Sequence, residues 1–465
     1  MKNKKKVKVI PLGGHGEIGK NITAIEYDDE IIVIDCGLGF PEAEMYGVDL
    51  VIPDITYLLN NKDKVRGIVL THGHEDHIGS LPYVLKELNV PVYGTRLTLG
   101  LVESKLKEHN MLSDCDLVVV KAGEVVKMDQ LHVEFIRNSH SIADSCSLAI
   151  HTPQGIILHT GDFKIDYTPI DGEVMDLDRF ARLGREKVLL LMADSTNVER
   201  EGYAASEKVI GENLDRVFGK AKGRMIVTTF ASNIHRMQQI INSSLLYGRK
   251  VAFSGRSMEN VSQVAMDLGY LHLPPEHMIN VDDIKKYPSD KITIITTGSQ
   301  GDTVIISASP IPGNEKFISR VINELFRKGA DVIYHAIEEV HVSGHGFQEE
   351  LKLIHTLVRP KFFMPVHGEY KHLRMHCMLA QNLGMDPENI FIMDTGQVLS
   401  LDSEEAKIDG KVHSGSVMVD GLGVGDVGNI VLRDRKHLAE DGILAVVATI
   451  ERASYSVIAG PDIVT

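Results

Sequence analysis

The residues with the clearest chemical capacity lie in the segment Thr-His-Gly-His-Glu-Asp-His at positions 71–77. Three histidines and one aspartate fall within its last six positions. Imidazole and carboxylate groups are ligands for zinc and similar divalent metals. The alternative is a polar loop that is merely rich in histidine, but the end of a buried strand rarely carries four such side chains without a metal. The segment therefore predicts a divalent metal site.

A strand followed by a helix is expected to position this segment. Residues 66–70 are typical of a short buried strand, and the apolar spacing of residues 78–88 predicts a helix. On the extended part, side chains alternate, so His72 and His74 point the same way. Asp76 and His77 open the helix and point towards a neighbouring volume. Two pairs of ligands aimed at adjacent points favour two metals over one.

Other candidate residues also follow β-rich or apolar runs. Asp35 ends one such run, and we expect it to orient a metal-binding histidine, a cap or turn residue being the alternative. His140 follows a second run and, taken alone, is equally well explained as a core histidine. Asp162 and Asp194 end two more runs. Because α/β folds place chemistry where strand ends meet at one sheet edge, we expect these residues to converge.

Length and composition describe an ordinary globular protein. The 465 residues favour two or three domains, with 43% hydrophobic and 24% charged residues. The net charge of −15 argues against a non-specific nucleic-acid coat, although it leaves room for an enzyme with a local basic channel. The four cysteines form no CxxC pair, which fits a reducing cytoplasm. No apolar run predicts a membrane helix, and the basic N-terminus lacks the core of an export signal.

These motifs carry a resemblance to a known family. The HGHEDH segment (72–77), His140, Asp162 in HTGDFK and Asp35 together resemble the metallo-β-lactamase superfamily. Asp194 in ADSTN, His345 in HVSGH (341–345) and His367 in PVHGEY resemble three further motifs of the β-CASP nucleases. With TTFASN (228–233), they are similar to bacterial ribonuclease J over essentially the whole chain. The fold that this implies is α/β, a metallo-β-lactamase αββα sandwich with an inserted β-CASP α/β domain.

The resemblance and the order of predicted elements divide the chain in three. Residues 1–206 are expected to form the first part of the metallo-β-lactamase domain, and residues 207–346 the inserted β-CASP domain. Predicted strands and helices alternate in this insertion, which favours a parallel sheet with crossover helices. Residues 347–465 are expected to complete the first domain and begin a linker to a C-terminal domain beyond Thr465. Members of the family usually have a further segment at the position that follows Gly301 in this chain.

The resemblance implies two Zn²⁺ ions per chain, with Mn²⁺ accepted by the same ligands. One metal would be held by His72, His74 and His140. The other would be held by Asp76, His77 and His367, with Asp162 bridging the two. Metals about 3.5–4 Å apart can share a water and lower its pKa, and the hydroxide can attack phosphorus in line.

The resemblance also implies roles around the metals. Asp194 and His345 would transfer protons and stabilise the leaving group, although a purely structural hydrogen-bonding role is the alternative for His345. A phosphate pocket is expected from small polar residues and their backbone amides, although a turn serine is the ordinary explanation for each serine alone. Its residues would be Ser232, Asn233, His341, Val342, Ser343, Gly344 and His345. A calcium site is expected at Asp49 and Asp420.

The function implied is that of a zinc-dependent ribonuclease with 5′-to-3′ exonuclease and endonuclease activity on single-stranded RNA, favouring a 5′-monophosphate end. It would act in mRNA decay and rRNA maturation in the cytoplasm. The full-length protein would form a homodimer or tetramer and meet other RNA-degradation proteins. Another hydrolase of the same fold is one alternative, but it would not need the inserted domain. A non-catalytic RNA-binding paralogue is the other, but it would be expected to lose ligands.

Overall fold

The structure is a computed structural model. Most of the chain lies in two compact units. Residues 1–38 and 53–415 form the first unit, and residues 39–52 and 416–465 form the second. Two sequence features, the segment 297–302 and His341, lie outside the described residues. In the described part of the chain, no helix is long and apolar enough to cross a membrane. The structure describes residues 5–42, 44–296, 303–307, 315–327, 330–334, 342–421, 423–441, 445–450 and 457–464.

Two large sheets form the centre of the first unit. The eight-stranded sheet has the spatial order β22 (Ala406–Lys411), β21 (Gln397–Leu401), β1 (Val7–Gly13), β3 (Ile22–Tyr27), β4 (Glu30–Ile34), β6 (Val65–Val69), β7 (Val92–Gly94) and β8 (Leu117–Val119). The six-stranded sheet has the order β19 (Phe362–Val366), β13 (Val188–Asp194), β12 (Gly155–His159), β11 (Cys146–Thr152), β10 (His132–Arg137) and β9 (Val125–Lys127). Parallel pairs β4–β6, β12–β13 and β13–β19 bring the ends of these strands to one side of their sheets.

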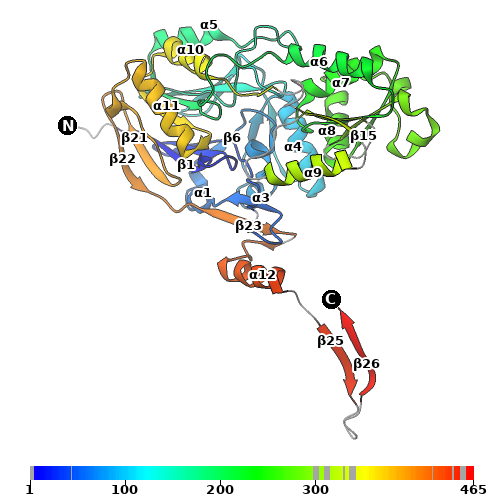
Figure 1. Ribbon diagram of the computed structural model, residues 1–465. Coiled ribbons are helices and arrows are strands. Elements are labelled where there is room, and N and C mark those ends of the chain that lie inside the picture. Colours follow the sequence, from blue (N-terminus) through cyan, green and yellow to red (C-terminus); the bar gives the residue numbers. More distant parts are fainter. Residues whose placement is uncertain are drawn as a thin grey trace. The chain divides into compact units, whose positions relative to one another are not determined.

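Three apolar layers explain why these sheets stack. Val9, Ile25 and Phe135 belong to a buried cluster shared by the two sheets. A second cluster joins the outer face of the eight-stranded sheet to α3 (Leu81–Glu87) and α4 (Arg96–Glu108). The third joins the six-stranded sheet to α5 (Leu177–Glu186), α10 (Gln348–Val358) and α11 (Tyr370–Asn382), which group together in Figure 1. Helix, sheet, sheet and helix layers follow one another, which confirms the predicted αββα sandwich.

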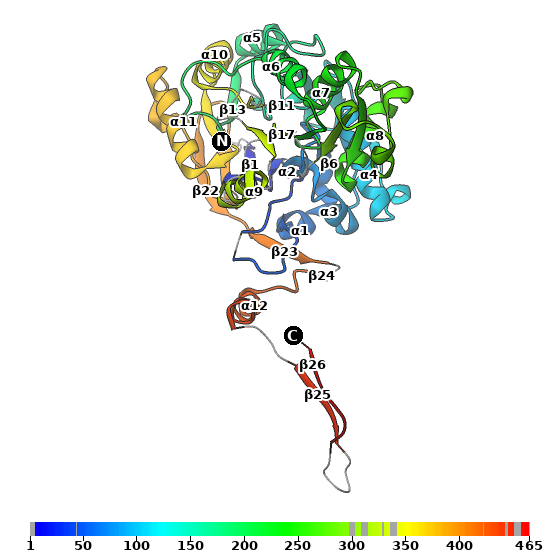
Figure 2. The ribbon, with the colours of Figure 1, turned by 45° about the vertical axis from the view of Figure 1, so that its right-hand side comes forward.

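The inserted segment forms a separate five-stranded sheet, in the order β15 (Lys250–Ser254), β16 (Ile292–Thr296), β14 (Met225–Thr228), β17 (Thr303–Ile306) and β18 (Asp331–Tyr334). Every neighbouring pair in it is parallel, as the alternation of strands and helices predicts. Its helices are α6 (Glu207–Lys220), α7 (Ile234–Leu246), α8 (Arg256–Asp267) and α9 (Glu315–Arg327). Helix α8 lies beside α4 in both views (Figures 1 and 2), so the insertion packs on the first domain.

The second unit is small. Strand β5 (Leu50–Pro53) pairs with β23 (Ser416–Asp420), which pairs in turn with β24 (Gly423–Val424). Helix α12 (Asn429–Asp441) follows, and β25 (Ala445–Ile450) and β26 (Val457–Val464) form an antiparallel ribbon. The domain boundaries expected from the sequence stay predictions.

One predicted element near the metal motif differs in the structure. The single helix expected over residues 78–88 is two helices, α2 (Glu75–Ile78) and α3, interrupted at Gly79 and Ser80. The break has a physical reason. Ser80 precedes α3, and Pro82 lies in its first turn, where a missing N–H costs no hydrogen bond, whereas proline inside a longer helix would break one.

Candidate metal centre

The predicted metal ligands all follow strands or open a helix at one place in the first unit. His72 and His74 follow β6, and Asp76 and His77 lie in α2, as the spacing predicts. His140, Asp162 and His367 come just after β10, β12 and β19, three strands of the other sheet. The centre therefore lies where the ends of both sheets meet.

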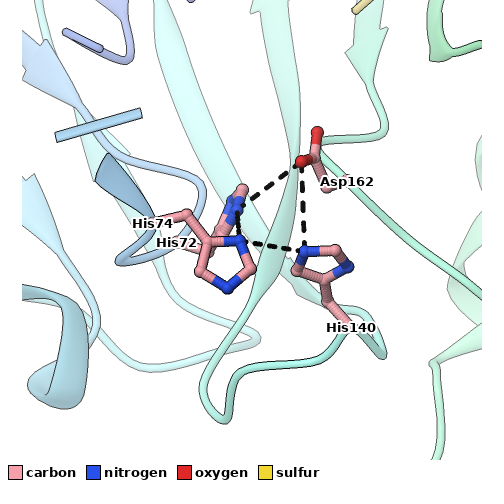
Figure 3. A group of neighbouring side chains, drawn as sticks. All are labelled: His72, His74, His140 and Asp162. Carbon is pink, nitrogen blue, oxygen red and sulfur yellow. Dashed lines mark hydrogen bonds and ion pairs between the residues drawn. The ribbon is translucent and has the colours of Figure 1, made fainter. Parts of the chain in front are cut away.

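The Asp162 carboxylate is the common point of the centre. Its Oδ2 lies 3.2 Å from His77 Nε2 and 3.3 Å from His367 Nε2. The same oxygen lies 3.7 Å from His72 Nε2 and 3.9 Å from His140 Nε2. Figure 3 shows His72, His74, His140 and Asp162 turned towards one shared volume. One carboxylate oxygen thus faces histidines from both predicted ligand sets.

Ligand atoms group into the two sets that the sequence predicts. Each set has ligand atoms within 4.8 Å of one another, which is close enough for the side chains to converge on one ion. A third set joins Asp162 and His367 to the two predicted catalytic residues, Asp194 and His345. The first two sets are His72, His74, His140 and Asp162, and Asp76, His77, Asp162 and His367. Nitrogen and carboxylate donors at this density suit a divalent cation.

The charge state of the buried groups also suits a cation. Burial lowers the pKa of His72 and of His140 well below the usual range, and lowers that of His74 to about 4. These histidines are therefore neutral near pH 7, which is the form that binds metal. Burial opposes a charge on His77 as well, but the carboxylates around it, Asp162 first, raise its pKa well above the usual range. This side of the centre therefore favours a positive charge.

Asp35 lies behind the ligands, where the sequence places it. Its Oδ2 accepts a hydrogen bond from His77 Nδ1 at 2.8 Å, so Nε2 of that ring faces Asp162. The same oxygen accepts a hydrogen bond from the Thr71 hydroxyl at 2.8 Å. That hydroxyl oxygen in turn lies 3.0 Å from His72 Nδ1. One buried carboxylate thus supports a ligand of each set, directly for His77 and through Thr71 for His72.

Asp194 and His345 form a hydrogen-bonded pair beside the ligands. His345 Nδ1 donates to Asp194 Oδ2 at 2.7 Å, and the other carboxylate oxygen accepts from Thr196 N and Oγ1. The His345 ring stacks on His367, with 5.5 Å between the ring centroids. Burial lowers the pKa of His345, but Asp194 outweighs this and raises it to about 9. The pair can therefore hold a proton next to the predicted metal ligands.

The predicted phosphate residues separate into two places. Ser343 and Gly344 lie against the centre, and Val342 beside them is buried. Ser232 and Asn233 lie at the start of α7, where the Asn233 side chain caps the helix by accepting from the Arg236 backbone N–H. Among the described residues no hydrogen bond joins these two segments, although Val342 and Ile234 belong to one buried hydrophobic cluster. The phosphate pocket stays a prediction.

Gly344 has a structural role that the sequence did not suggest. Its carbonyl oxygen accepts from His140 Nδ1 at 2.7 Å, which turns Nε2 of that ring towards Asp162. A Cβ atom at position 344 would lie 2.6 Å from His140 Cε1. Position 344 therefore needs glycine so that the ring of His140 can approach closely. This need is separate from the close approach of a phosphate that the sequence suggests.

The two residues of the expected calcium site lie in the second unit, and both carboxylates have protein partners. Asp49 Oδ2 accepts from the backbone N–H of Gly421 at 2.7 Å, and Asp420 Oδ2 accepts from Arg435. Neither residue belongs to a group of three or more metal-type ligands within the described residues. The calcium site stays a prediction.

Three supporting residues were missed in the sequence. The first is Thr71, which begins the motif but was not predicted to have a role. The second is Asn197, which donates to Ser343 Oγ at 2.6 Å and to the His345 carbonyl at 3.1 Å. The third, Asn21, contacts Asp76 and His367. Thr71 and Asn197 lie inside quoted motifs and Asn21 follows a glycine-rich turn, and a polar side chain at such a place is their only signal in the sequence.

Sequence comparison assigns the chain to a family. Family models match in the order "Metallo-beta-lactamase superfamily" (15–194), "Ribonuclease J, beta-CASP domain" (222–303), "Zn-dependent metallo-hydrolase RNA specificity domain" (329–393) and "Ribonuclease J C-terminal domain" (430–465). Ribonuclease J 1 of Streptococcus pyogenes is 43% identical over 99% of this chain and 86% of its own length. The chain belongs to the ribonuclease J family. Ribonuclease J2 of Bacillus subtilis is 44% identical over 100% of this chain and 87% of its own length. Ribonuclease J of Thermus thermophilus is 46% identical over 95% of this chain and 82% of its own length.

Family membership agrees with the resemblance seen in the motifs. The match to the ribonuclease J C-terminal domain begins at residue 430, within the stretch where the sequence predicts a linker. A solved structure, a protein of unknown function from Enterococcus faecalis V583, superposes with a TM-score of 0.62 at 19% identity. The superposition covers 85% of this chain and 100% of the other protein. The similarity supports the fold alone.

Proposed function

We propose that the chain is a zinc-dependent ribonuclease that degrades single-stranded RNA from the 5′ end and also cuts it internally. Membership of the ribonuclease J family makes it a metal-dependent ribonuclease. The match to an RNA specificity domain over residues 329–393 supports RNA binding. The observation that carries the proposal is the position of Asp162, whose Oδ2 faces histidines of both ligand sets.

The residues fit the metals that the family implies. His72, His74 and His140 would hold one zinc, Asp76, His77 and His367 the other, and Asp162 would bridge. Two bound divalent ions supply a water nucleophile of lowered pKa and stabilise charge on the phosphoryl oxygens. The protein fixes the geometry, since Asp35, Thr71 and the Gly344 carbonyl hold His77, His72 and His140 in orientation. Every ligand position is filled, which disfavours a non-catalytic paralogue.

Asp194 and His345 are the proposed proton-transfer residues. The Asp194 carboxylate accepts from His345 Nδ1, so it stabilises the imidazolium and leaves Nε2 as the proton donor. An imidazolium beside the scissile bond can give its proton to the departing ribose oxygen. Because His345 stacks on the ligand His367, this proton would lie at the edge of the metal centre.

We further propose the cellular setting that the sequence suggests. The enzyme would act in the cytoplasm in mRNA decay and rRNA maturation, with other RNA-degradation proteins as partners. The full-length protein would be a homodimer or tetramer. Domain boundaries at 206/207 and 346/347 belong to the same proposal.

Two divalent metals per chain are expected in the active enzyme, because seven ligand residues exceed what one tetrahedral zinc uses. Elemental analysis of protein purified without chelator should give a metal-to-chain ratio near two. Removing the metals with a chelator should abolish RNA cleavage, and adding Zn²⁺ or Mn²⁺ back should restore it. Full activity at a reproducible ratio of one would exclude the two-metal arrangement.

Ser343→Ala is expected to slow exonucleolysis of 5′-monophosphorylated RNA by roughly ten- to a hundredfold, and internal cleavage by less. The Ser343 Oγ already accepts from Asn197 Nδ2 and from the His345 N–H, so its own O–H remains to donate to a phosphate oxygen. Both rates should be measured at one salt concentration, since phosphate contacts depend on salt.

Ser113→Ala is the matched control, because the hydroxyl of this exposed serine donates to its neighbour Asp114, and the change should leave both rates unchanged. Equal losses of both activities in Ser343→Ala would point to damage at the metal centre. No loss in either would remove Ser343 from the substrate site.

A further inference from the structure

Asn21, which directly precedes β3, contacts three of the expected metal ligands, Asp76, His77 and His367. Its Oδ1 accepts from His367 Nδ1 at 3.0 Å. Its Nδ2 donates to the Asp76 carbonyl oxygen at 3.0 Å, and it lies 3.1 Å from His77 Nε2 and 3.4 Å from Asp76 Oδ2. The backbone N–H of Asn21 donates to the same carbonyl oxygen. A single amide side chain therefore touches residues that are 55 and 346 positions away along the chain.

The backbone around Asn21 is shaped to allow this approach. A Cβ atom on Gly14, which has a φ of +78°, would lie 2.4 Å from Asn21 Oδ1. A Cβ atom on Gly37 would lie 1.5 Å from the Asp76 carbonyl oxygen that Asn21 binds. The two-residue strand β2 (His15–Gly16) pairs with β20 (Gly368–Glu369), directly after His367. The glycine-rich turn thus brings Asn21 against the returning end of the domain.

His367 needs such a partner. Its backbone φ is 55°, a left-handed conformation that is uncommon for residues other than glycine, so contacts from its surroundings help to hold it in place. An amide oxygen accepts a hydrogen bond only from a protonated Nδ1, so it selects the tautomer whose Nε2 lone pair is free. That Nε2 faces Asp162 Oδ2 at 3.3 Å.

We propose that Asn21 is a positioning residue for one of the two metals, the one held by Asp76, His77 and His367. The proposal rests on the two-metal centre of the proposed function. It predicts an asymmetry, because Asn21 contacts this ligand set, and in the described part of the chain no hydrogen bond joins it to His72, His74 or His140. Of those three, His72 is oriented by Thr71 and His140 by the Gly344 carbonyl, and His74 Nε2 lies 3.4 Å from Ser141 Oγ.

Metal titration of the whole chain tests the proposal without measuring catalysis. Metal-stripped wild type, Asn21→Ala and Asn21→Asp would be titrated with Zn²⁺ against a competing chelator, and bound metal would be measured for each equivalent. In Asn21→Ala the first equivalent should bind as in wild type, and the second about 10- to 100-fold more weakly. Asn21→Asp keeps an oxygen that accepts from His367 Nδ1, so it should lose less than Asn21→Ala.

Asn61→Ala is the matched control, since Asn61 Nδ2 also donates to a backbone carbonyl, that of Tyr57, away from the centre. It should bind both equivalents as wild type does. Two equivalents bound as tightly in Asn21→Ala as in wild type would overturn the proposal. Equal weakening of both equivalents would overturn it too, because it would indicate general damage. A wild type that binds fewer than two equivalents would instead contradict the proposed function.

Discussion

Asp162→Ala is expected to lower RNA cleavage by more than roughly a thousandfold while leaving most RNA binding intact. Its Oδ2 lies within 3.9 Å of four histidine nitrogens, two from each ligand set. Without it both proposed metals would lose a ligand, and four imidazoles would lose the negative charge that they share. Affinity for RNA depends mainly on phosphate contacts spread over the surface, so it should change only a few-fold.

Cleavage and binding should be measured on the same preparation, by product length and by equilibrium titration with a short single-stranded RNA. Asp129→Ala, at an exposed position, is the control and should cleave normally. Cleavage by Asp162→Ala at close to the wild-type rate would mean that Asp162 does not bridge the metals.

His345→Ala and Asp194→Asn are each expected to slow cleavage by about 10²- to 10⁴-fold, the usual cost of losing a general acid. The 2.7 Å hydrogen bond makes the two residues one unit. Removing Asp194 takes away the charge that favours the imidazolium, and removing His345 takes away the proton itself. The double variant should therefore be little slower than His345→Ala, because effects within a unit are not additive.

Metal content decides how such a loss is interpreted. Both residues also belong to a group with Asp162 and His367 that is compact enough to hold a metal. If they act on protons, the single variants should keep the wild-type metal-to-chain ratio. Loss of metal in step with activity would reassign them as ligands.

The sequence predicts the parts of the site that depend on local spacing. His72, His74, Asp76 and His77 lie within six positions, so strand alternation and one helical turn are enough to aim them. The parallel inserted sheet also follows from the alternation of predicted strands and helices, whereas the αββα layers were expected from the resemblance alone. The other ligands, His140, Asp162 and His367, follow separate strands. They were grouped by the resemblance, together with the rule that strand ends of an α/β fold converge at one sheet edge.

Other features depend on contacts between distant parts of the chain. Asn21 looks like the end of a glycine-rich turn until the fold brings it to His367. Gly344 resembles a phosphate-binding glycine, yet the ring of His140 fills the space beside it. Asn233 shared a motif with Ser232 and was grouped with the pocket, whereas its side chain caps α7. Hydrogen-bond partners of single polar side chains leave no periodic signal, so the sequence cannot predict them.

The central claim is that the centre around Asp162 cleaves RNA. The most direct measurement uses single-stranded RNA labelled at its 5′ end, carrying either a monophosphate or a triphosphate, incubated with metal-loaded protein. The expected result is release of labelled mononucleotide from the monophosphorylated RNA, and mainly longer, internally cut fragments from the triphosphorylated RNA. Both should disappear after chelation and in Asp162→Ala. Cleavage that survives chelation and the loss of Asp162, or intact RNA with the metal-loaded wild type, would contradict the account.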